Sequence, residues 1–332
     1  MAPGAGEESA WRGLVVEKRD AGRRLDAFLS LRFQAFSRSE FSRHIIEGLV
    51  RSESREVKPS TRIAEGERLR IYVPGLAPTT PQPPLPAILY EDERLIVADK
   101  PAGMLVHPAG ERFVWSLVGL FRSAYPDHRI DLVHRLDRDT SGAILLSKDT
   151  GANAFMKDLF FRREVGKTYL AITRGCPRWD SAEADGPIGA SETSEIRLRK
   201  AVVPGGLPAR TSVRTLRRMD GLALVECVLH TGRTHQIRVH LEHLGHPILG
   251  DKIYGQPDAV FLACIEEGAD AEQRAVLRFP RHALHSRSLR FQHPAGGRRM
   301  VTAPLPADMQ HLVDGGMPAW PSPCPPRSAS QG

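Results

Sequence analysis

A proline-rich segment in the first third of the chain most constrains what this sequence can fold into. Residues 74–86 read PGLAPTTPQPPLP. Because proline lacks a backbone N–H and fixes φ, neither a helix nor an internal strand continues through such a segment, which instead forms a stiff spacer. The sequence therefore predicts two domains within its 332 residues. The predicted parts are a disordered tail (1–10), a small domain (11–74), a linker (75–87), a large domain (88–310) and a second disordered tail (311–332).

The charge of the chain favours a polyanionic partner. There are 46 Lys and Arg against 39 Asp and Glu, which gives a net charge of +7. This balance suits nucleic acid or an anionic membrane, although a generally arginine-rich chain without such a partner has the same composition. The apolar runs are shorter than the roughly 18 residues of a membrane span, and the acidic N-terminus MAPGAGEESA lacks the apolar core of a secretory signal. We therefore expect a cytoplasmic protein with no membrane partner.

The cysteines and histidines give little support to a metal site or a disulfide framework. The four cysteines are scattered without paired spacing: Cys176, Cys227, Cys264 and Cys324. Five histidines fall between His230 and His246. His240 and His243 have acceptable ligand spacing on a helix, but His235 and His240 diverge around the helix axis, and no cysteine is near. The sequence thus favours no metal.

The small domain has the pattern of two helices followed by strands. An apolar face is predicted on a first helix from Leu25, Phe28 and Leu29. A second helix is predicted to open at Ser37, to form a capping box with Glu40, to place Phe41, Ile45 and Ile46 on its apolar side, and to end at Gly48. Strands are predicted at 49–51 and 69–73. The same helix carries Arg38, Arg43 and His44, which form either an RNA-binding face or a merely solvated one.

The stretch from Leu132 to Asp149 is predicted to be the functional centre of the large domain. Residues 134–142, HRLDRDTSG, are dense in charge and turn formers, and the apolar run at 143–147 is typical of a buried strand. A polar loop next to the end of a rigid strand is a common location for catalytic residues, although a solvated turn has the same pattern. Asp137 is flanked by two arginines, which would keep its carboxylate ionised.

A second stretch, at 230–244, predicts a partner for this carboxylate. Ile237, Leu241 and Leu244 recur at helical spacing from Thr234 onward. Arg238 lies one residue from that apolar stripe, so it points inward only if it is paired, because a charge near a core needs a partner. Asp137 is the obvious candidate.

Other elements of the large domain follow from periodicity and turn residues. Strands are predicted at 95–98, 167–172 (with alternating faces), 223–229 and 282–291, and helices at 115–121 and shortly after 304. Residues 176–210 are predicted to be a loop or hairpin excursion, and 256–280 a partly helical insertion. Lys100 and His107 flank a tight turn and suit RNA contact and packing roles equally.

These motifs resemble the RluA family of pseudouridine synthases. HRLDRDTSG is similar to the family's catalytic motif, and GRTHQIRVH, DKPAGMLVHP and PILGDKIYG are similar to further blocks. The resemblance covers about Arg23 to Phe291, and the N-terminal part resembles an S-four RNA-binding domain. It implies an α+β fold with a mixed, mostly antiparallel central sheet. The implied activity is the isomerisation of uridine to pseudouridine in structured RNA, without a cofactor.

The resemblance also implies residue roles. Asp137 would be the catalytic carboxylate, Arg238 its partner, and Tyr169 the residue against the target base, while Arg135 would flip that base. Further RNA contacts are expected from His134, Arg233, His235 and Lys167. We expect a monomer that acts on large-subunit ribosomal RNA, with tRNA as the alternative substrate and a non-catalytic RNA-binding assembly factor as the alternative function.

Overall fold

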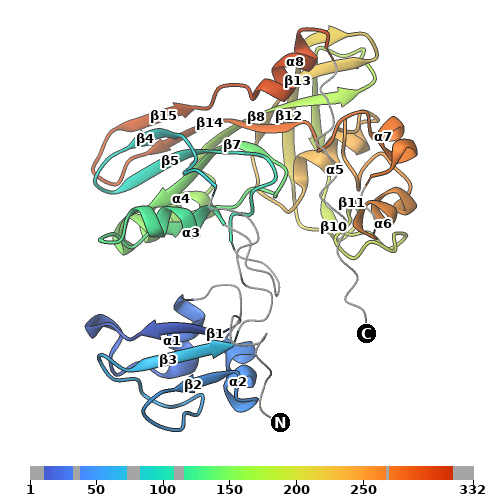
Figure 1. Cartoon of the computed structure of the whole chain (residues 1–332). Coiled ribbons are helices and arrows are strands. Elements are labelled where there is room, and N and C mark those ends of the chain that lie inside the picture. The colour runs from blue at the N-terminus through green and yellow to red at the C-terminus, as the bar shows by residue number, and fades with distance from the viewer. Residues whose placement is uncertain (1–10, 33–37, 73–82, 108–115, 267–268, 317–332) are drawn as a thin grey trace. The chain divides into compact units, whose positions relative to one another are not determined.

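The computed structural model describes residues 11–32, 38–72, 83–107, 116–266 and 269–316 (Figure 1). The chain forms two compact units. The first comprises 1–85 with 105–124, and the second comprises 86–104 with 125–332. The unit boundary after Leu85 falls inside the predicted linker, but residues 105–124, which were predicted to belong to the large domain, group with the first unit. In the described part of the chain, no helix combines the length and the apolar character needed to cross a membrane.

The first unit contains a small sheet and short helices. Its elements are β1 (Trp11–Val15), the 3-10 turn η2 (Lys18–Asp20), α1 (Leu25–Arg32), α2 (Arg38–Ile46), β2 (Val50–Ser52), β3 (Arg68–Tyr72) and α3 (Leu117–Ala124). The sheet is antiparallel in the order β1-β3-β2. The predicted helices and later strands are thus present, while β1 was not predicted, because WRGLV has too little alternation to indicate a strand.

One side-chain prediction in this unit is wrong. Phe41 and Ile45 are buried in the core, but the side chain of Ile46 is 77% exposed. The reason is helical geometry: positions four apart share a face, whereas Ile46 follows Phe41 by five residues and turns away. Gly48 ends the helix with a φ of +73°, as predicted. The predicted cap residue Ser37 lies outside the described residues.

A long sheet dominates the second unit. Its strands run in the order β4-β5-β7-β14-β8-β13-β12-β9, with β15 paired to β14 and β6 paired to β7. Their bounds are β4 (Ile88–Glu91), β5 (Leu95–Lys100), β6 (Asp131–Leu132), β7 (Ser141–Ser147), β8 (Gly166–Arg174), β9 (Ser181–Asp185), β12 (Arg210–Met219), β13 (Leu222–Leu229), β14 (Leu284–Gln292) and β15 (Arg298–Thr302). Among the strand pairs of this sheet in the described residues, only β7 and β14 run in parallel, so the predicted mixed, mostly antiparallel sheet is confirmed.

The remaining elements of this unit are a hairpin and helices. The hairpin is β10 (Ile188–Ala190) with β11 (Lys200–Val202), and the helices are α4 (Thr150–Phe161), α5 (Gln236–His243), α6 (Asp258–Glu266), α7 (Ala271–Leu277) and α8 (Ala307–Val313). The helix α8 extends past the domain boundary predicted at residue 310.

Three features of the second unit differ from the sequence prediction. The excursion at 176–210, predicted to be a loop or hairpin, does contain the hairpin β10-β11, but it also contributes the unpredicted strand β9, which pairs with β12. β8 does not alternate throughout: residues 169–173 are all buried, because the strand lies inside the sheet between β14 and β13. The helix α4 was not predicted, although Asp149 caps it by accepting the N–H of Ala152.

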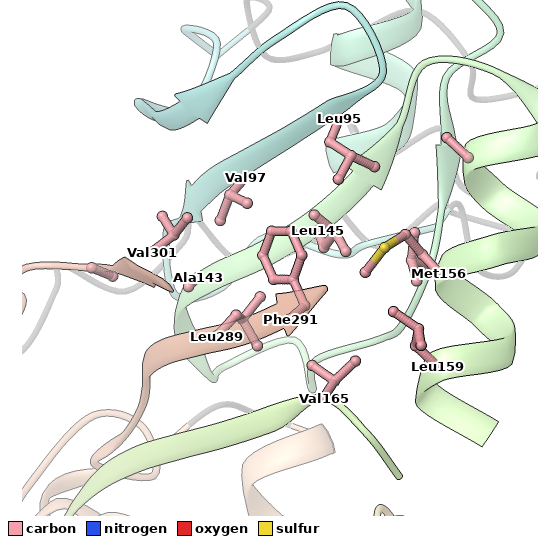
Figure 2. Packing of buried hydrophobic residues seen from close by; sticks show 13 residues of the cluster. Leu95, Val97, Ala143, Leu145, Met156, Leu159, Val165, Leu289, Phe291 and Val301 are labelled. Atoms are coloured by element: carbon pink, nitrogen blue, oxygen red, sulfur yellow. The ribbon is translucent and has the colours of Figure 1, made fainter. Parts of the chain in front are cut away.

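The core beside the central strands is where the functional loop is anchored. Figure 2 shows apolar side chains from several strands packed against α4: Leu95, Val97, Ala143, Leu145, Leu289, Phe291 and Val301, with Met156 and Leu159 on the helix. All seven residues of β7 are buried. Because β7 is held on every side, the loop that precedes it, residues 133–140, starts from a rigid base.

Candidate active site

The backbone of the loop 133–140 is fixed from one side by a buried lysine. The side chain of Lys100, which is 0% exposed, donates to the carbonyl oxygens of Pro101 (2.9 Å), Met104 (2.9 Å) and Arg138 (2.8 Å). The N–H of Gly103 donates to the same Arg138 carbonyl. Burial lowers the pKa of Lys100 to about 7. Lys100 therefore ties the turn after β5 to the loop, which favours the packing role over RNA contact.

The segment that leads into β14 fixes the loop from the other side. His282 Nε2 lies 2.8 Å from the Thr140 hydroxyl, and His285 Nδ1 lies 3.0 Å from the Ser141 hydroxyl. Gly142 has a φ of +104°, and a Cβ there would lie 2.3 Å from the carbonyl oxygen of Ser286. Only glycine fits this parallel contact between β7 and β14.

Arg238 joins the loop to a second, deeper carboxylate. Its Nη1 donates to Asp137 Oδ2 at 3.1 Å, while Nε and Nη2 donate to the two oxygens of Asp251 at 2.6 and 2.8 Å. The predicted pairing of Asp137 with Arg238 is thus confirmed. Asp251 is 0% exposed, whereas the Asp137 side chain is 32% exposed. With two carboxylates and one guanidinium, the cluster keeps a negative charge, and its solvent-accessible member is Asp137.

The charges in this cluster set its pKa values. Burial alone would raise the pKa of Asp251, but Arg238 lowers it to about 2. Burial would likewise raise the pKa of Asp137, yet the positive charge of Arg238 holds it below its usual value. The pKa of Arg238 is raised, because the two carboxylates outweigh burial. All three groups are therefore ionised at neutral pH.

His235 presents a ring nitrogen to Asp137 from a strained position. It precedes α5 with a φ of +59°, uncommon for a residue other than glycine, and its Nε2 lies 3.9 Å from Asp137 Oδ2. Tyr254 Oη accepts the N–H of Lys200 (3.0 Å) and lies 2.9 Å from His235 Nδ1. If the phenol proton points to Nδ1, its other partner in the described structure, the ring proton is on Nε2, facing the carboxylate. Burial lowers the pKa of His235 to about 4, so the ring is neutral.

Tyr169 lies within the electrostatic reach of the same carboxylate. It sits on β8, paired with Cys227 of β13 and Ser286 of β14, and is 6% exposed. Burial raises its pKa to about 12, and the charge of Asp137 contributes in the same direction. Its phenol is therefore neutral and offers a ring face and a hydroxyl rather than a base.

Comparison with known proteins decides the family. Residues 94–243 match the model of the RNA pseudouridylate synthase family. The chain is 38% identical over 317 residues to ribosomal large subunit pseudouridine synthase D of Xanthomonas campestris, with 92% of each chain covered. It is also 38% identical over 323 residues to an uncharacterized RNA pseudouridine synthase of Chloroflexus aurantiacus, covering 92% of this chain and 94% of the relative. This chain belongs to the RluA family of RNA pseudouridine synthases.

A solved structure agrees with this assignment. Human RNA pseudouridylate synthase domain containing 4 matches with a TM-score of 0.54 and 27% identity, over 69% of this chain and 92% of the other. The resemblance to the RluA family, the fold class and the enzyme class expected from the sequence are thereby confirmed, while the S-four character of the N-terminal part stays a prediction. The part matched by the family model contains Asp137, Tyr169 and Arg238 but ends before Asp251.

The other residues predicted to bind RNA in this synthase fall into two groups. Arg135 is exposed, and no hydrogen bond or carboxylate contact is found for its side chain in the described part of the chain. Arg233 donates to the carbonyl of Pro208 (3.2 Å). His134 and Lys167 are engaged internally.

The His134 ring stacks on Phe160, with 4.7 Å between centroids, and its Nε2 accepts the N–H of Leu145 (3.1 Å). Burial lowers its pKa to about 3. Lys167 is 8% exposed, donates to the Thr231 carbonyl (3.1 Å), and has its pKa lowered by burial to about 8. The structure thus brings Asp137, Arg238, His235 and Tyr169 together, and gives His134 and Lys167 contacts that support the scaffold.

Sequence reasoning missed three residues of the synthase site: Asp251, Tyr254 and His282. Asp251 and Tyr254 lie in the quoted block PILGDKIYG, and His282 lies in the predicted strand at 282–291. The available signal was an aspartate two residues after the apolar pair Ile248–Leu249, since a buried carboxylate requires a cation. Gly250 was a second signal: its φ is +74°, and a Cβ there would lie 2.1 Å from the Arg281 carbonyl oxygen.

The histidines near α5 do not converge in the described residues. His240 is 0% exposed, and its two ring nitrogens lie 2.9 Å from the Thr211 hydroxyl and 3.1 Å from the Gly186 carbonyl. Within the part of the chain that the structure describes, no group of three His, Cys, Asp or Glu side chains is arranged to hold a metal ion. The cysteines there, Cys176, Cys227 and Cys264, are free thiols.

Proposed function

We propose that Asp137 is the carboxylate that acts at the anomeric carbon of a target uridine. One observation carries the proposal: Arg238 holds Oδ2 of Asp137, while Oδ1 makes no hydrogen bond within the described residues and the side chain is 32% exposed. A carboxylate that is held in one orientation, ionised and accessible to a substrate is suited to attack a sugar carbon or to remove a sugar proton. Asp251 supports this role by satisfying the rest of the guanidinium.

The chemistry is a balanced rearrangement. The bond from ribose C1′ to uracil N1 breaks, a bond from C1′ to C5 forms, the proton on C5 leaves, and N1 gains a proton. Product and substrate are isomers, so no electrons are gained or lost. Whether Asp137 attacks C1′ or first removes a sugar proton, it must be ionised, and the lowered pKa supplies that condition.

Access to the base requires that it leave its stack. Arg135 is exposed and free of carboxylate partners in the described part of the chain, so its planar guanidinium can fill the vacated place. Tyr169 then receives the flipped ring against its neutral phenol. His235 and Arg233 are proposed to contact the same nucleotide or its neighbours, while His134 and Lys167 support the loop through the contacts described above.

We further propose large-subunit ribosomal RNA as the substrate. The support is the name of the Xanthomonas campestris relative, which aligns over 92% of both chains. The alternative substrate is tRNA. A ribosomal RNA substrate in a bacterial-type enzyme implies work in the cytoplasm, and a monomer suffices for a site whose proposed residues come from one chain.

The test follows the C5 proton. Unmodified ribosomal RNA carrying tritium at uridine C5 releases tritium only where the isomerisation occurs. We expect Asp137→Asn to reduce release by on the order of 10²–10⁴-fold, the scale of an essential acid–base group. Asp139→Asn is the matched control, because it makes the same change two residues away, and it should keep most activity. Full release by Asp137→Asn would refute the assignment.

Mapping the modified positions separates the substrate candidates. The same incubation is repeated with bulk tRNA and with fragments of large-subunit RNA, and new pseudouridines are located by sequencing. Modification of tRNA alone would contradict the ribosomal proposal while leaving the role of Asp137 intact. Binding without modification of either RNA would favour a non-catalytic assembly factor.

A further inference from the structure

The sheet of the first unit has two chemically different faces. One face carries Leu69 and Ile71 of β3 and Val50 of β2, buried with the apolar side chains of α1 and α2. The other face, which we call the outer face, is formed by the alternate residues. It carries Trp11, Val15, Arg51, Arg68, Arg70 and Tyr72. Three arginines and two aromatic rings thus share one side of a three-stranded sheet.

Elsewhere in this unit, arginines are paired with buried carboxylates. Arg24 and Arg38 both contact Asp26 (2.8 and 3.2 Å), and Arg55 contacts Glu67 (2.7 Å). The arginines of the outer face have no carboxylate partner within the described residues. Arg51 donates to the backbone carbonyl of Gly48, and all three are exposed.

The arrangement of these arginines costs stability unless an anion joins them. Arg51 and Arg70 lie directly opposite one another in the β2–β3 register. Like charges at such positions are destabilising. Their guanidinium carbons lie 4.7 Å (Arg51) and 5.7 Å (Arg70) from the centroid of the Trp11 ring, so the indole offsets part of this repulsion.

The aromatic rings form a continuous platform with these cations. The Trp11 and Tyr72 rings are 5.3 Å apart at 54°. Apart from them, the exposed aliphatic side chain on this face is Val15, which is 55% exposed. This is too little apolar area for insertion into a membrane. Aromatic rings among unpaired arginines match instead the bases and phosphates of a single nucleic-acid strand.

We propose that the outer face binds single-stranded RNA next to the segment that is modified. Arg51, Arg68 and Arg70 contact successive phosphates, and an unstacked base lies against Trp11 or Tyr72. The proposal rests on RNA as the substrate class, and it differs from the role first predicted for the helix α2 with Arg43. It assigns to this unit the capture of unpaired RNA, whereas the residues around Asp137 select the uridine.

The test uses the full chain and a probe that the catalytic site does not process. A fluorescein-labelled oligoadenylate of 15 nucleotides contains no uridine, and its anisotropy reports binding at several salt concentrations. For single strands, the slope of log K against log salt is about −0.7 per phosphate contact. We therefore expect the triple variant Arg51→Gln/Arg68→Gln/Arg70→Gln to flatten the slope by about 2 and to raise Kd at least tenfold at low salt.

A second variant separates stacking from charge. Trp11→Ala should raise Kd roughly 5- to 100-fold, the scale of one base–aromatic stack, and leave the salt slope unchanged. Trp11→Phe, which keeps a ring, should recover most of the affinity. Circular dichroism and thermal melting of each variant verify that the unit is folded. The triple arginine variant changes exposed residues only, so its result can be interpreted even if Trp11→Ala does not fold.

A charge-matched control excludes a general effect of net charge. Arg43→Gln/Lys58→Gln/Arg62→Gln removes the same charge from α2 and from the connection between β2 and β3. The proposal is overturned if this control flattens the slope as much as the outer-face variant does, or if the outer-face variant leaves the slope unchanged. Tritium release from a short uridine-containing hairpin should be the same in both triple variants. This assay reports the chemistry at Asp137 and so distinguishes a failure of the proposed catalytic function from a failure of RNA binding on the outer face.

Discussion

Arginines in the two units have opposite surroundings. The side chain of Arg238 is 6% exposed, and its guanidinium is shared between Asp137 and Asp251. Arg68 and Arg70 are exposed and lack a carboxylate partner in the described part of the chain. A buried guanidinium shared by two carboxylates is not available to an incoming phosphate, but it can hold a carboxylate in one orientation. An exposed guanidinium without a carboxylate partner holds no neighbouring group in place, but it remains available to bind RNA.

The difference shows where each kind of charge is tolerated. Arg238 is stable in the core because two carboxylates compensate it, and the excess negative charge stays on the reachable side at Asp137. The outer-face arginines remain in water, which screens the repulsion between Arg51 and Arg70, so the cost that this pair adds while no ligand is bound is small. Stability should therefore depend strongly on the first group and little on the second.

The largest expected effect is at Asp251. Asp251→Asn leaves Arg238 buried with one partner fewer, which should lower the free energy of unfolding by on the order of 3–5 kcal/mol. Activity should fall as well, because Asp137 loses its aligned partner. Urea unfolding and tritium release measure the two effects. Asp180→Asn is the control, because Asp180 is 90% exposed and its partner Arg218 is 42% exposed. Equal losses in the two variants would contradict the importance given to burial.

A smaller effect is expected at the junction of β7 and β14. Gly142→Ala places a Cβ 2.3 Å from the Ser286 carbonyl oxygen at a φ of +104°. Backbone strain of about 1–3 kcal/mol adds to this clash, and the shift should displace Asp137 and reduce kcat. Gly205→Ala has a similarly positive φ of +78° but open space around its Cβ. Thermal unfolding of both variants separates strain from the clash; indistinguishable Tm values would show that the close approach is unimportant.

The third prediction concerns acid. Burial lowers the pKa of His282 from 6.5 to about 4, so the unfolded chain binds a proton in this interval and the folded chain does not. Stability from this residue is present above pH 6.5 and is lost as pH falls toward 4, by up to about 1.4 kcal/mol per pH unit. His282→Gln should make unfolding free energies less dependent on pH between 6.5 and 4.5. An unchanged pH profile would mean that His282 is protonated in the fold.

The smallest effect is expected on the outer face. Arg68→Gln should change the free energy of unfolding by no more than about 0.5 kcal/mol, since the side chain is exposed and unpaired. Arg55→Gln, in the same unit, should be more damaging, because it removes the partner of Glu67, whose pKa Arg55 lowers to about 2. Urea titration of the two variants gives the comparison. A greater loss of unfolding free energy for Arg68→Gln than for Arg55→Gln would mean that Arg68 makes a stabilising contact within the protein, which RNA would have to displace.

Periodic and local patterns made much of the fold predictable. The strands at 95–98, 223–229 and 282–291 and the helix after Thr234 were found because their apolar spacing is strong. β1 and α4 were missed, since β1 has little alternation and the pattern of α4 is weak beside its polar residues. Ile46 was assigned to the wrong side of α2 because it directly follows Ile45 in the sequence, whereas the side chains of adjacent residues on a helix point in different directions.

The sequence alone indicated a division of the chain near residue 85, the charged loop in front of a buried strand, and the need of Arg238 for a carboxylate, because these follow from chain chemistry and spacing. Only the tertiary structure decided that Asp251 takes two of the hydrogen bonds of Arg238 and leaves Asp137 one, and that Arg51 and Arg70 face each other without an anion. Such facts depend on which distant residues meet. Arg238 and Asp251 are only 13 positions apart, yet whether such residues meet is set by strand register and packing, which no local pattern encodes.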